Sequence, residues 1–184
     1  SLEAREMAKN KPFSFLHVSR PEIDLDHKIE FNNPKVYEKG AENLNKLIKN
    51  KVLIQDDEDC LYIYEIILNE ISQTGIGCIA SVEAYEKNII KKHEYTKPVK
   101  EDDRVENITK LEAQTGPVLL AYKNTDKISE AINKVKDQKP VYNVFAHDGS
   151  NHKIWVINNK NQIEKILREI NSMKSLFIAD GHHR

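Results

Sequence analysis

The chain has 184 residues, and its 28 Lys and Arg against 29 Asp and Glu leave a net charge of -1. A chain of this length can bury a core, and its nearly balanced charge excludes an overall field that attracts nucleic acid or an anionic membrane. We therefore expect no membrane partner, and nucleic acid only if a local patch binds it. No apolar run approaches the roughly 20 residues that span a bilayer and no signal peptide is visible, so the expected location is cytoplasmic.

The first half of the chain is predicted to mix helices with strands. Asn33 can cap a helix and Pro34 fits a first turn, so an amphipathic helix is expected from there to about Lys49. Two strand-like runs flank the turn residues Asn69 and Glu70, which predicts an antiparallel hairpin. In chain order, the predicted elements are a helix over 2–9, a strand over 13–18, a helix over 34–49, strands over 60–68 and 74–82, and a helix over 83–90.

The second half continues in the same way. Its predicted elements are a helix over 99–114, a buried strand over 118–122, a helix capped by Thr125 and ending before Pro140, strands over 141–146 and 152–157, a helix over 161–171 and a strand over 175–179. The strands 141–146 and 152–157 read as a second hairpin. Because two strand pairs are hairpins while helices lie between the other strands, the predicted fold is one α/β (α+β) domain over residues 1–184, with a mixed sheet and flanking helices.

The two cysteines, Cys60 and Cys78, lie in apolar runs and have no metal-ligand spacing. They are predicted to be buried free thiols in a reducing compartment.

The densest chemistry follows the last predicted strand, whose apolar residues favour burial on both faces. Gly181 allows a sharp turn, and the free N–H groups of a helix after it would favour an anion. Arg184 adds a cation suited to phosphate, and Asp180 could accept a proton or hold Mg²⁺. His182 or His183 could move a proton or bind a metal. An ordinary polar turn explains the same residues about as well from composition alone.

A second polar cluster follows the predicted helix over 83–90. Adjacent His93 and Glu94 could be a base with its carboxylate, and Lys92 and Arg104 could neutralise an anion. Glu94 with Asp180 would supply the two carboxylates of a Mg²⁺ nucleotide site. A solvated charged loop is the competing interpretation, and the residues by themselves favour it.

Two further polar stretches also have competing explanations. Thr115 and Gly116 could offer a hydroxyl and a backbone N–H to phosphate, although a helix-ending turn is the commoner explanation. His147, Asp148 and His152 have the chemistry of metal ligands, but the polarity of a hairpin loop explains them better.

The segment 177–184, Phe-Ile-Ala-Asp-Gly-His-His-Arg, resembles the hallmark of a mainly bacterial family, the domain of unknown function 1015. Further matches to this family are the segments 3–8, 14–24, 92–94 with 103–104, and 115–118. The resemblance implies functional roles for His93, Glu94 and Arg104, which fall on the second motif. It also implies that the chain is part of a longer protein, without the family's first segment and without the family's residues after Arg184. The segment 180–184 is similar to the phosphate-binding motif of the ParB and sulfiredoxin superfamily.

These features lead to a functional hypothesis and two alternatives. The hypothesis is an enzyme that binds a small phosphorylated ligand, with Mg²⁺ and a nucleotide (ATP, ADP or CTP) as cofactors, and catalyses phosphoryl transfer or hydrolysis. One alternative is a regulatory module that, like ParB, binds nucleic acid or a protein. The other is a metal-dependent hydrolase that uses His93, Asp180 and His182.

Overall fold

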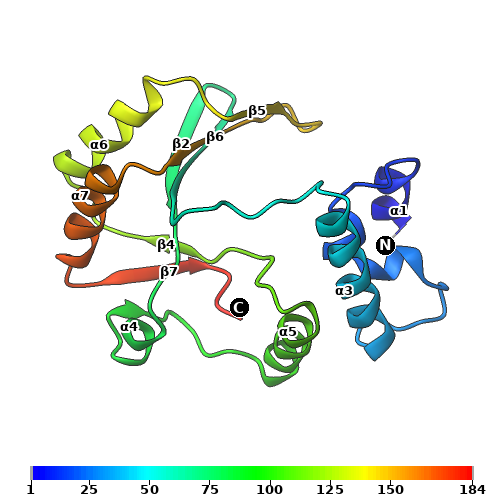
Figure 1. Ribbon diagram of the computed structural model, residues 1–184. Helices are drawn as coiled ribbons and strands as arrows, with labels where there is room; N and C mark the ends of the chain where they lie inside the picture. Colours follow the sequence, from blue (N-terminus) through cyan, green and yellow to red (C-terminus); the bar gives the residue numbers. More distant parts are fainter. Residues whose placement is uncertain (1, 184) are drawn as a thin grey trace. The chain divides into compact units, whose positions relative to one another are not determined.

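The computed structural model describes residues 2–183 (Figure 1). Its helices are α1 (Leu2–Ala8), α2 (Leu16–Ser19), the 3₁₀ helix η1 (Pro21–Asp24), α3 (Pro34–Lys49), α4 (Val82–Glu86), α5 (Pro98–Leu111), α6 (Asp126–Lys136) and α7 (Lys160–Asn171). Its strands are β1 (Leu61–Leu68), β2 (Ile71–Gly77), β3 (Ile90–Lys91), β4 (Leu119–Ala121), β5 (Tyr142–Phe145), β6 (Asn151–Ile157) and β7 (Leu176–Asp180). The predicted mixture of helices with two antiparallel hairpins is confirmed.

The contacts within the chain form two compact units. Unit 1 comprises the residues up to Gln55, Lys92–Leu120 and the residues from Ile178 onward, and unit 2 comprises Asp56–Lys91 and Ala121–Phe177. The single domain expected from the sequence stays a prediction.

The centre of unit 2 is an antiparallel sheet of four strands in the order β2-β1-β6-β5. The hairpin of β1 and β2 turns at Asn69 and Glu70, which both have positive φ angles (49° and 67°), as a tight two-residue hairpin requires. The second hairpin joins the first because β6 pairs with β1 from Leu61 opposite Ile157 onward. The two hairpins therefore belong to one sheet.

Helices α6 and α7 cover this sheet and close its core. Alternate residues of β1, such as Ile63, are buried, as expected for a strand with one covered face. The core consists of Leu61, Ile63, Ile128, Ile132, Val135, Trp155, Ile157 and Ile166. The Thr125 side chain caps α6 by accepting a hydrogen bond from the Ile128 N–H, as predicted.

In unit 1, α3 packs against α2, η1 and α5. The helix begins where the sequence predicts, because the Asn33 side chain accepts a hydrogen bond from the Lys35 N–H (3.0 Å) and Pro34 occupies the first turn. The core of this unit contains Val18, Leu44, Leu47 and Leu111.

The remaining strands form a sheet in the order β3-β7-β4, in which β3 runs parallel to β7. The sequence predicted that β7 is buried on both faces, and this is wrong. Ile178 is the buried residue of this strand, whereas Phe177 is 52% exposed. Apolarity alone does not distinguish a strand covered on both faces from one covered on a single face.

Two further local predictions are wrong. Residues 13–18 were expected to form a strand, but Leu16 begins α2 and its N–H donates to the Ser14 hydroxyl (3.3 Å). A serine that bonds the backbone two residues on favours a turn over a strand. The helix predicted over 83–90 ends at Glu86, and Asn88 follows with a φ of 55°, which no α-helix accommodates.

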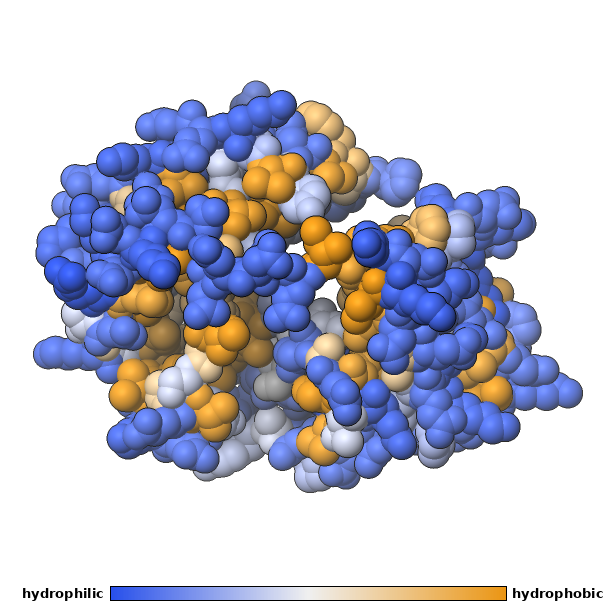
Figure 2. All heavy atoms as spheres, in the orientation of Figure 1, coloured by the Kyte–Doolittle hydropathy of each residue, from blue (hydrophilic) through white to orange (hydrophobic). Residues whose placement is uncertain are grey.

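The face drawn in Figure 2 is mostly hydrophilic, with hydrophobic patches between the hydrophilic side chains. All four residues of the edge strand β5 are exposed. Cys60 is half-buried and Cys78 is exposed, so the prediction that both thiols are buried is wrong. No helix in residues 2–183 combines the length and the apolar character needed to cross a membrane.

Candidate functional site

The parallel pairing of β3 with β7 accounts for the meeting of the two polar motifs. Ile90 lies opposite Leu176 and Lys91 lies opposite Phe177. Because the strands run in the same direction, the residues that follow them leave at the same edge of the sheet. The segment Lys92–Glu94 follows β3, and Gly181 with the two histidines follows β7. Gly181 has a φ of 81°, so the sharp turn predicted there is confirmed.

His93 is oriented by the backbone of β7. Its Nδ1 lies 2.8 Å from the carbonyl oxygen of Ile178. A carbonyl oxygen can only accept, so Nδ1 carries the proton and donates it. The neutral ring therefore has its lone pair on Nε2, the atom that points toward Glu94.

Glu94 and His182 complete a compact cluster with His93. Oε1 of Glu94 lies 3.0 Å from Nε2 of His182 and 3.4 Å from Nε2 of His93. The two imidazole rings meet edge to face, with centroids 5.3 Å apart. One ligand atom from each residue lies within 4.8 Å of the other two, and this is the group of potential metal ligands found among residues 2–183. The cluster is open to solvent, since the His93 and Glu94 side chains are about half exposed.

His183 lies beside the cluster. Its ring is 3.9 Å from that of His182, measured between centroids, and its Nδ1 accepts a hydrogen bond from the Lys97 backbone N–H (3.3 Å). Burial lowers the pKa of the His183 imidazole below its usual range, and the charges of His182, Lys100 and Lys97 lower it further, while Glu94 acts in the opposite direction. Both the bond to Nδ1 and the lowered pKa favour the neutral ring.

Asp180 ends β7 as an exposed residue and is not a member of the ligand group formed within residues 2–183. Its predicted role as a metal ligand with Glu94 stays a prediction. Lys92 is exposed on the segment that carries His93. Arg184 lies outside the described residues.

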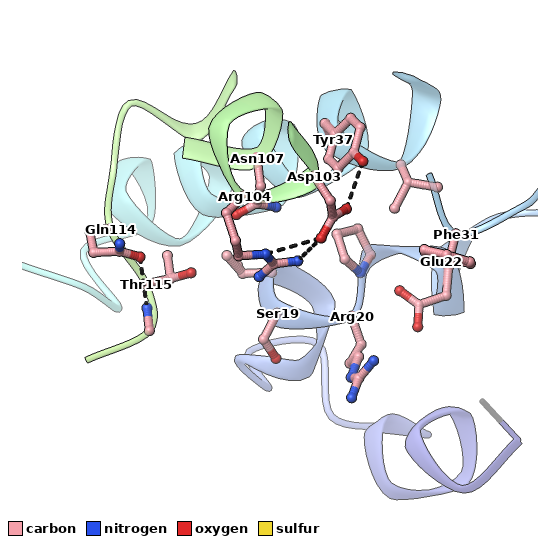
Figure 3. Close-up of a pocket in the computed structure, with 14 residues that line it drawn as sticks. Ser19, Arg20, Glu22, Phe31, Tyr37, Asp103, Arg104, Asn107, Gln114 and Thr115 are labelled. Atoms are coloured by element: carbon pink, nitrogen blue, oxygen red, sulfur yellow. Dashed lines mark hydrogen bonds and ion pairs between the residues drawn. The ribbon is translucent and has the colours of Figure 1, made fainter. Parts of the chain in front are cut away.

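The other predicted phosphate-binding residues gather in a different part of unit 1. Arg104, Thr115 and Gly116 line a cavity of about 410 Å³ that is also bounded by α2, η1 and α3 (Figure 3). The Gly116 N–H donates to the Gln114 side chain (3.3 Å). The sequence grouped Arg104 with His93 and Glu94, whereas in the structure Arg104 lines this cavity and the histidines lie in the cluster after β3 and β7.

Arg104 is held in this cavity by a chain of bonds (Figure 3). Its Nε and one terminal nitrogen donate to Oδ2 of Asp103. The Tyr37 hydroxyl donates to Oδ1 of the same carboxylate (2.7 Å). Burial and this hydrogen bond raise the pKa of Tyr37 to about 12, so the hydroxyl keeps its proton and remains a donor.

Sequence reasoning missed two charged residues of the cavity, Arg20 and Glu22. The signal that could have identified them is the Arg-Pro-Glu spacing, since proline restricts the backbone between two opposite charges.

The hairpin loop residues Asp148 and His152 make structural bonds in unit 2. The Ser150 hydroxyl lies 2.5 Å from Asp148 Oδ1 and 2.7 Å from His152 Nε2, and the Tyr64 hydroxyl lies 2.7 Å from His152 Nδ1. Hydrogen bonds from Ser150 hold the pKa of Asp148 below its usual range. These contacts support the interpretation of the loop as structural.

Comparison with known proteins leads to one family. No curated protein and no solved structure matches the chain significantly. A family model described as "Protein of unknown function (DUF1015)" matches residues 1–184, the whole chain. The chain therefore belongs to the DUF1015 family.

Proposed function

We propose that the protein is a metal-dependent hydrolase of a small phosphorylated molecule, in which His93, Glu94 and His182 bind a divalent transition metal ion. The observation that carries the proposal is the convergence of two imidazole nitrogens on one carboxylate oxygen, at 3.0 and 3.4 Å. With Nδ1 protonated, neutral His93 turns a lone pair toward a negative oxygen. A cation between them, either a proton or a metal ion, removes that repulsion.

The contacts around the cluster favour a metal ion over a proton. Metal-binding histidines usually donate their second ring N–H to a carbonyl or a carboxylate, and His93 does so toward Ile178. Two imidazoles and one carboxylate form a common ligand set of catalytic Zn²⁺, which leaves a position for water. Mg²⁺ prefers oxygen ligands, so this cluster suits Zn²⁺ or Mn²⁺ better than the Mg²⁺ expected from the sequence.

Hydrolysis follows from the open position and the charge of the surroundings. A metal ion at such a site lowers the pKa of a bound water to near neutrality. Lys97 and Lys100 lie close enough to affect His183, so their positive charges also attract an anionic substrate. His183, with its neutral ring, can accept a proton or donate to a phosphoryl oxygen. The similarity of residues 180–184 to the ParB and sulfiredoxin phosphate motif gives further support to a phosphorylated substrate.

The test begins with metal binding. The protein is purified without a histidine tag, treated with a chelator and titrated with Zn²⁺, Mn²⁺ and Mg²⁺ by calorimetry. We expect one equivalent of Zn²⁺ or Mn²⁺ to bind, and the His93→Ala and His182→Ala variants to lose this binding. His27→Ala is the matched control, because His27 is an exposed histidine outside the cluster. Folded protein that binds neither ion, or variants that bind as well as the wild type, would refute the metal site.

Activity is then measured with 4-nitrophenyl phosphate, and with ATP, ADP and CTP as nucleotides of the same chemical class. We expect phosphate release that requires the metal ion and is lost in Glu94→Gln. Metal binding without phosphate release from any of these compounds would retain the metal site and reject phosphate ester hydrolysis.

A further inference from the structure

The cavity beside α3 contains charges that form no ion pair among residues 2–183. Arg20 and Glu22 both line it, on either side of Pro21 (Figure 3). Within residues 2–183, neither side chain forms an ion pair, with the other or with a third residue. A guanidinium and a carboxylate therefore remain available to a ligand at neighbouring positions of one segment.

Arg104 adds a second cationic edge to the same cavity. The Asp103 carboxylate accepts hydrogen bonds from Nε and one terminal nitrogen of Arg104. The other terminal nitrogen of Arg104 has no partner among residues 2–183. Because Asp103 also accepts from Tyr37, the guanidinium is fixed before any ligand arrives. A fixed guanidinium loses less freedom when it binds a carboxylate or a phosphate.

The segment that carries Arg20 and Glu22 is equally well fixed. Arg5 donates to three backbone carbonyls around η1, those of Glu22 (2.7 Å), Ile23 (2.5 Å) and Leu25 (2.8 Å). The Asn43 side chain of α3 donates to the Asp24 carboxylate (2.8 Å). The loop thus has a defined shape that does not depend on a ligand.

The cavity contains one positive and one negative charge with no ion-pair partner in the described part of the chain, and this combination favours a ligand that carries both charges. Arg104 is already neutralised by Asp103, so Arg20 and Glu22 are the charges left over. A simple anion would satisfy the arginines but would face the carboxylate of Glu22. A ligand with both an acidic group and an ammonium group satisfies all of them. Phe31 and Val36 provide apolar wall for the remainder of such a ligand.

We propose that this cavity binds a free amino acid or a closely related zwitterion. Its acidic group lies against Arg20 and the free edge of Arg104, and its ammonium group lies against Glu22. The volume of about 410 Å³ accommodates a molecule of this size together with water. The proposal does not depend on the metal site, because none of the cavity residues belongs to the group of His93, Glu94 and His182.

The test measures binding of each of the twenty common amino acids to the full chain, by calorimetry and thermal shift in the presence of a chelator. We expect saturable binding of at least one amino acid. For that amino acid, the carboxylic acid without the amine and the amine without the acid should bind at least about tenfold more weakly. If no amino acid binds to the folded protein, or if the acid without the amine binds as tightly, the proposal fails.

Variants identify the residues responsible. Arg20→Met should weaken binding of the amino acid at least about tenfold, and Glu22→Gln should abolish the preference for the amino acid over its acid without the amine. Lys28→Met and Glu30→Gln remove the same charges from exposed positions that do not line the cavity, and should bind like the wild type. Unchanged binding in both Arg20→Met and Glu22→Gln would place the ligand elsewhere. Arg20→Met and Glu22→Gln should still bind the metal ion, so loss of amino acid binding in these variants can be distinguished from failure of the proposed metal site.

Discussion

Glu65 is a buried carboxylate whose partners all come from other parts of unit 2. It is 5% exposed and accepts from Lys136 (2.5 Å) and Ser72 (2.8 Å), with Lys153 at 3.5 Å. Burial alone would raise its pKa, but the hydrogen bonds and the charges of Lys136 and Lys153 outweigh burial and hold the pKa below its usual range. A charge in this position is stable only while its partners remain.

Replacement of one partner should therefore be costly. We expect Lys136→Met to lower the free energy of unfolding by about 2 kcal/mol, because it leaves the Glu65 carboxylate with fewer partners in a buried place. The matched control is Lys127→Met, since Lys127 pairs with Glu169 while its side chain is 74% exposed, and its loss should cost at most about 0.5 kcal/mol. Urea denaturation measures both. Equal losses in the two variants would contradict the special role of the buried pair.

At the scale of elements, α3 packs closely where it meets η1 and α5 in unit 1. Gly40 of α3 is buried, and a Cβ added there would lie 2.9 Å from Cγ of Pro21 and 3.3 Å from Cδ1 of Leu111. The proline ring cannot rotate away as a long side chain can. Glycine at this position thus allows the helix to approach the segment that carries Arg20 and Glu22.

Gly40→Ala tests this contact. Alanine favours a helix over glycine by about 1 kcal/mol, yet we expect a net loss of about 1 to 2 kcal/mol in the free energy of unfolding, because the new methyl group overpacks the contact with Pro21. Gly75→Ala in β2 is the control, since nothing lies within 4 Å of a Cβ at that position. Thermal and urea denaturation should show little change in the control. A Gly40→Ala variant as stable as the wild type would mean that the two elements can separate slightly without cost.

At the scale of the whole molecule, the perturbed groups predict a range of pH in which the fold is most stable. Glu65 and Asp148 have lowered pKa values, whereas hydrogen bonding to Asp56 and burial raise the pKa of Tyr62 to about 12, as burial and Asp103 do for Tyr37. A carboxyl group whose pKa is lowered by folding adds stability at pH values above its pKa in the unfolded chain, which is about 4. This stability is lost as the pH falls through the pKa of the group in the folded protein. A tyrosine whose pKa is raised by folding adds stability at pH values below about 10, its pKa in the unfolded chain. This stability is lost as the pH rises toward 12.

We therefore expect the urea midpoint to be constant between about pH 7 and pH 8 and to fall on both sides. The lowered pKa of His183 removes stability below about pH 6.5, and the raised pKa values of Cys60 and Cys78 remove stability above about pH 8.5. Tyr62→Phe should flatten the alkaline part of the profile, and Glu65→Gln should flatten the acidic part, although each variant also changes the stability at neutral pH. If the profile of Tyr62→Phe had the same alkaline slope as that of the wild type, Tyr62 would not be the group responsible.

Much of the candidate site could be predicted from the sequence, because its residues are concentrated in two short motifs. The polar residues after β3 and β7 were identified from their density and their position next to apolar runs. No local sequence pattern could show whether Arg104 lies in the same site as His93 and Glu94. Arg104 lies on α5, and its environment depends on Tyr37 and Asp103, which are 66 residues apart in the chain.

The sequence alone determined the local features of this protein: the cap at Asn33, the turns at Asn69 and Gly181, and the helical stripes that form the two cores. These depend on backbone angles and on hydrogen bonds between neighbours in the chain, so a few residues suffice to specify them. Only the tertiary structure decided that β3 pairs in parallel with β7, which brings His93 to His182, and that Arg20 and Glu22 lie in the cavity with Arg104. Strand pairing and cavity shape arise from contacts between distant segments, and the free energy of those contacts depends on all the partners at once.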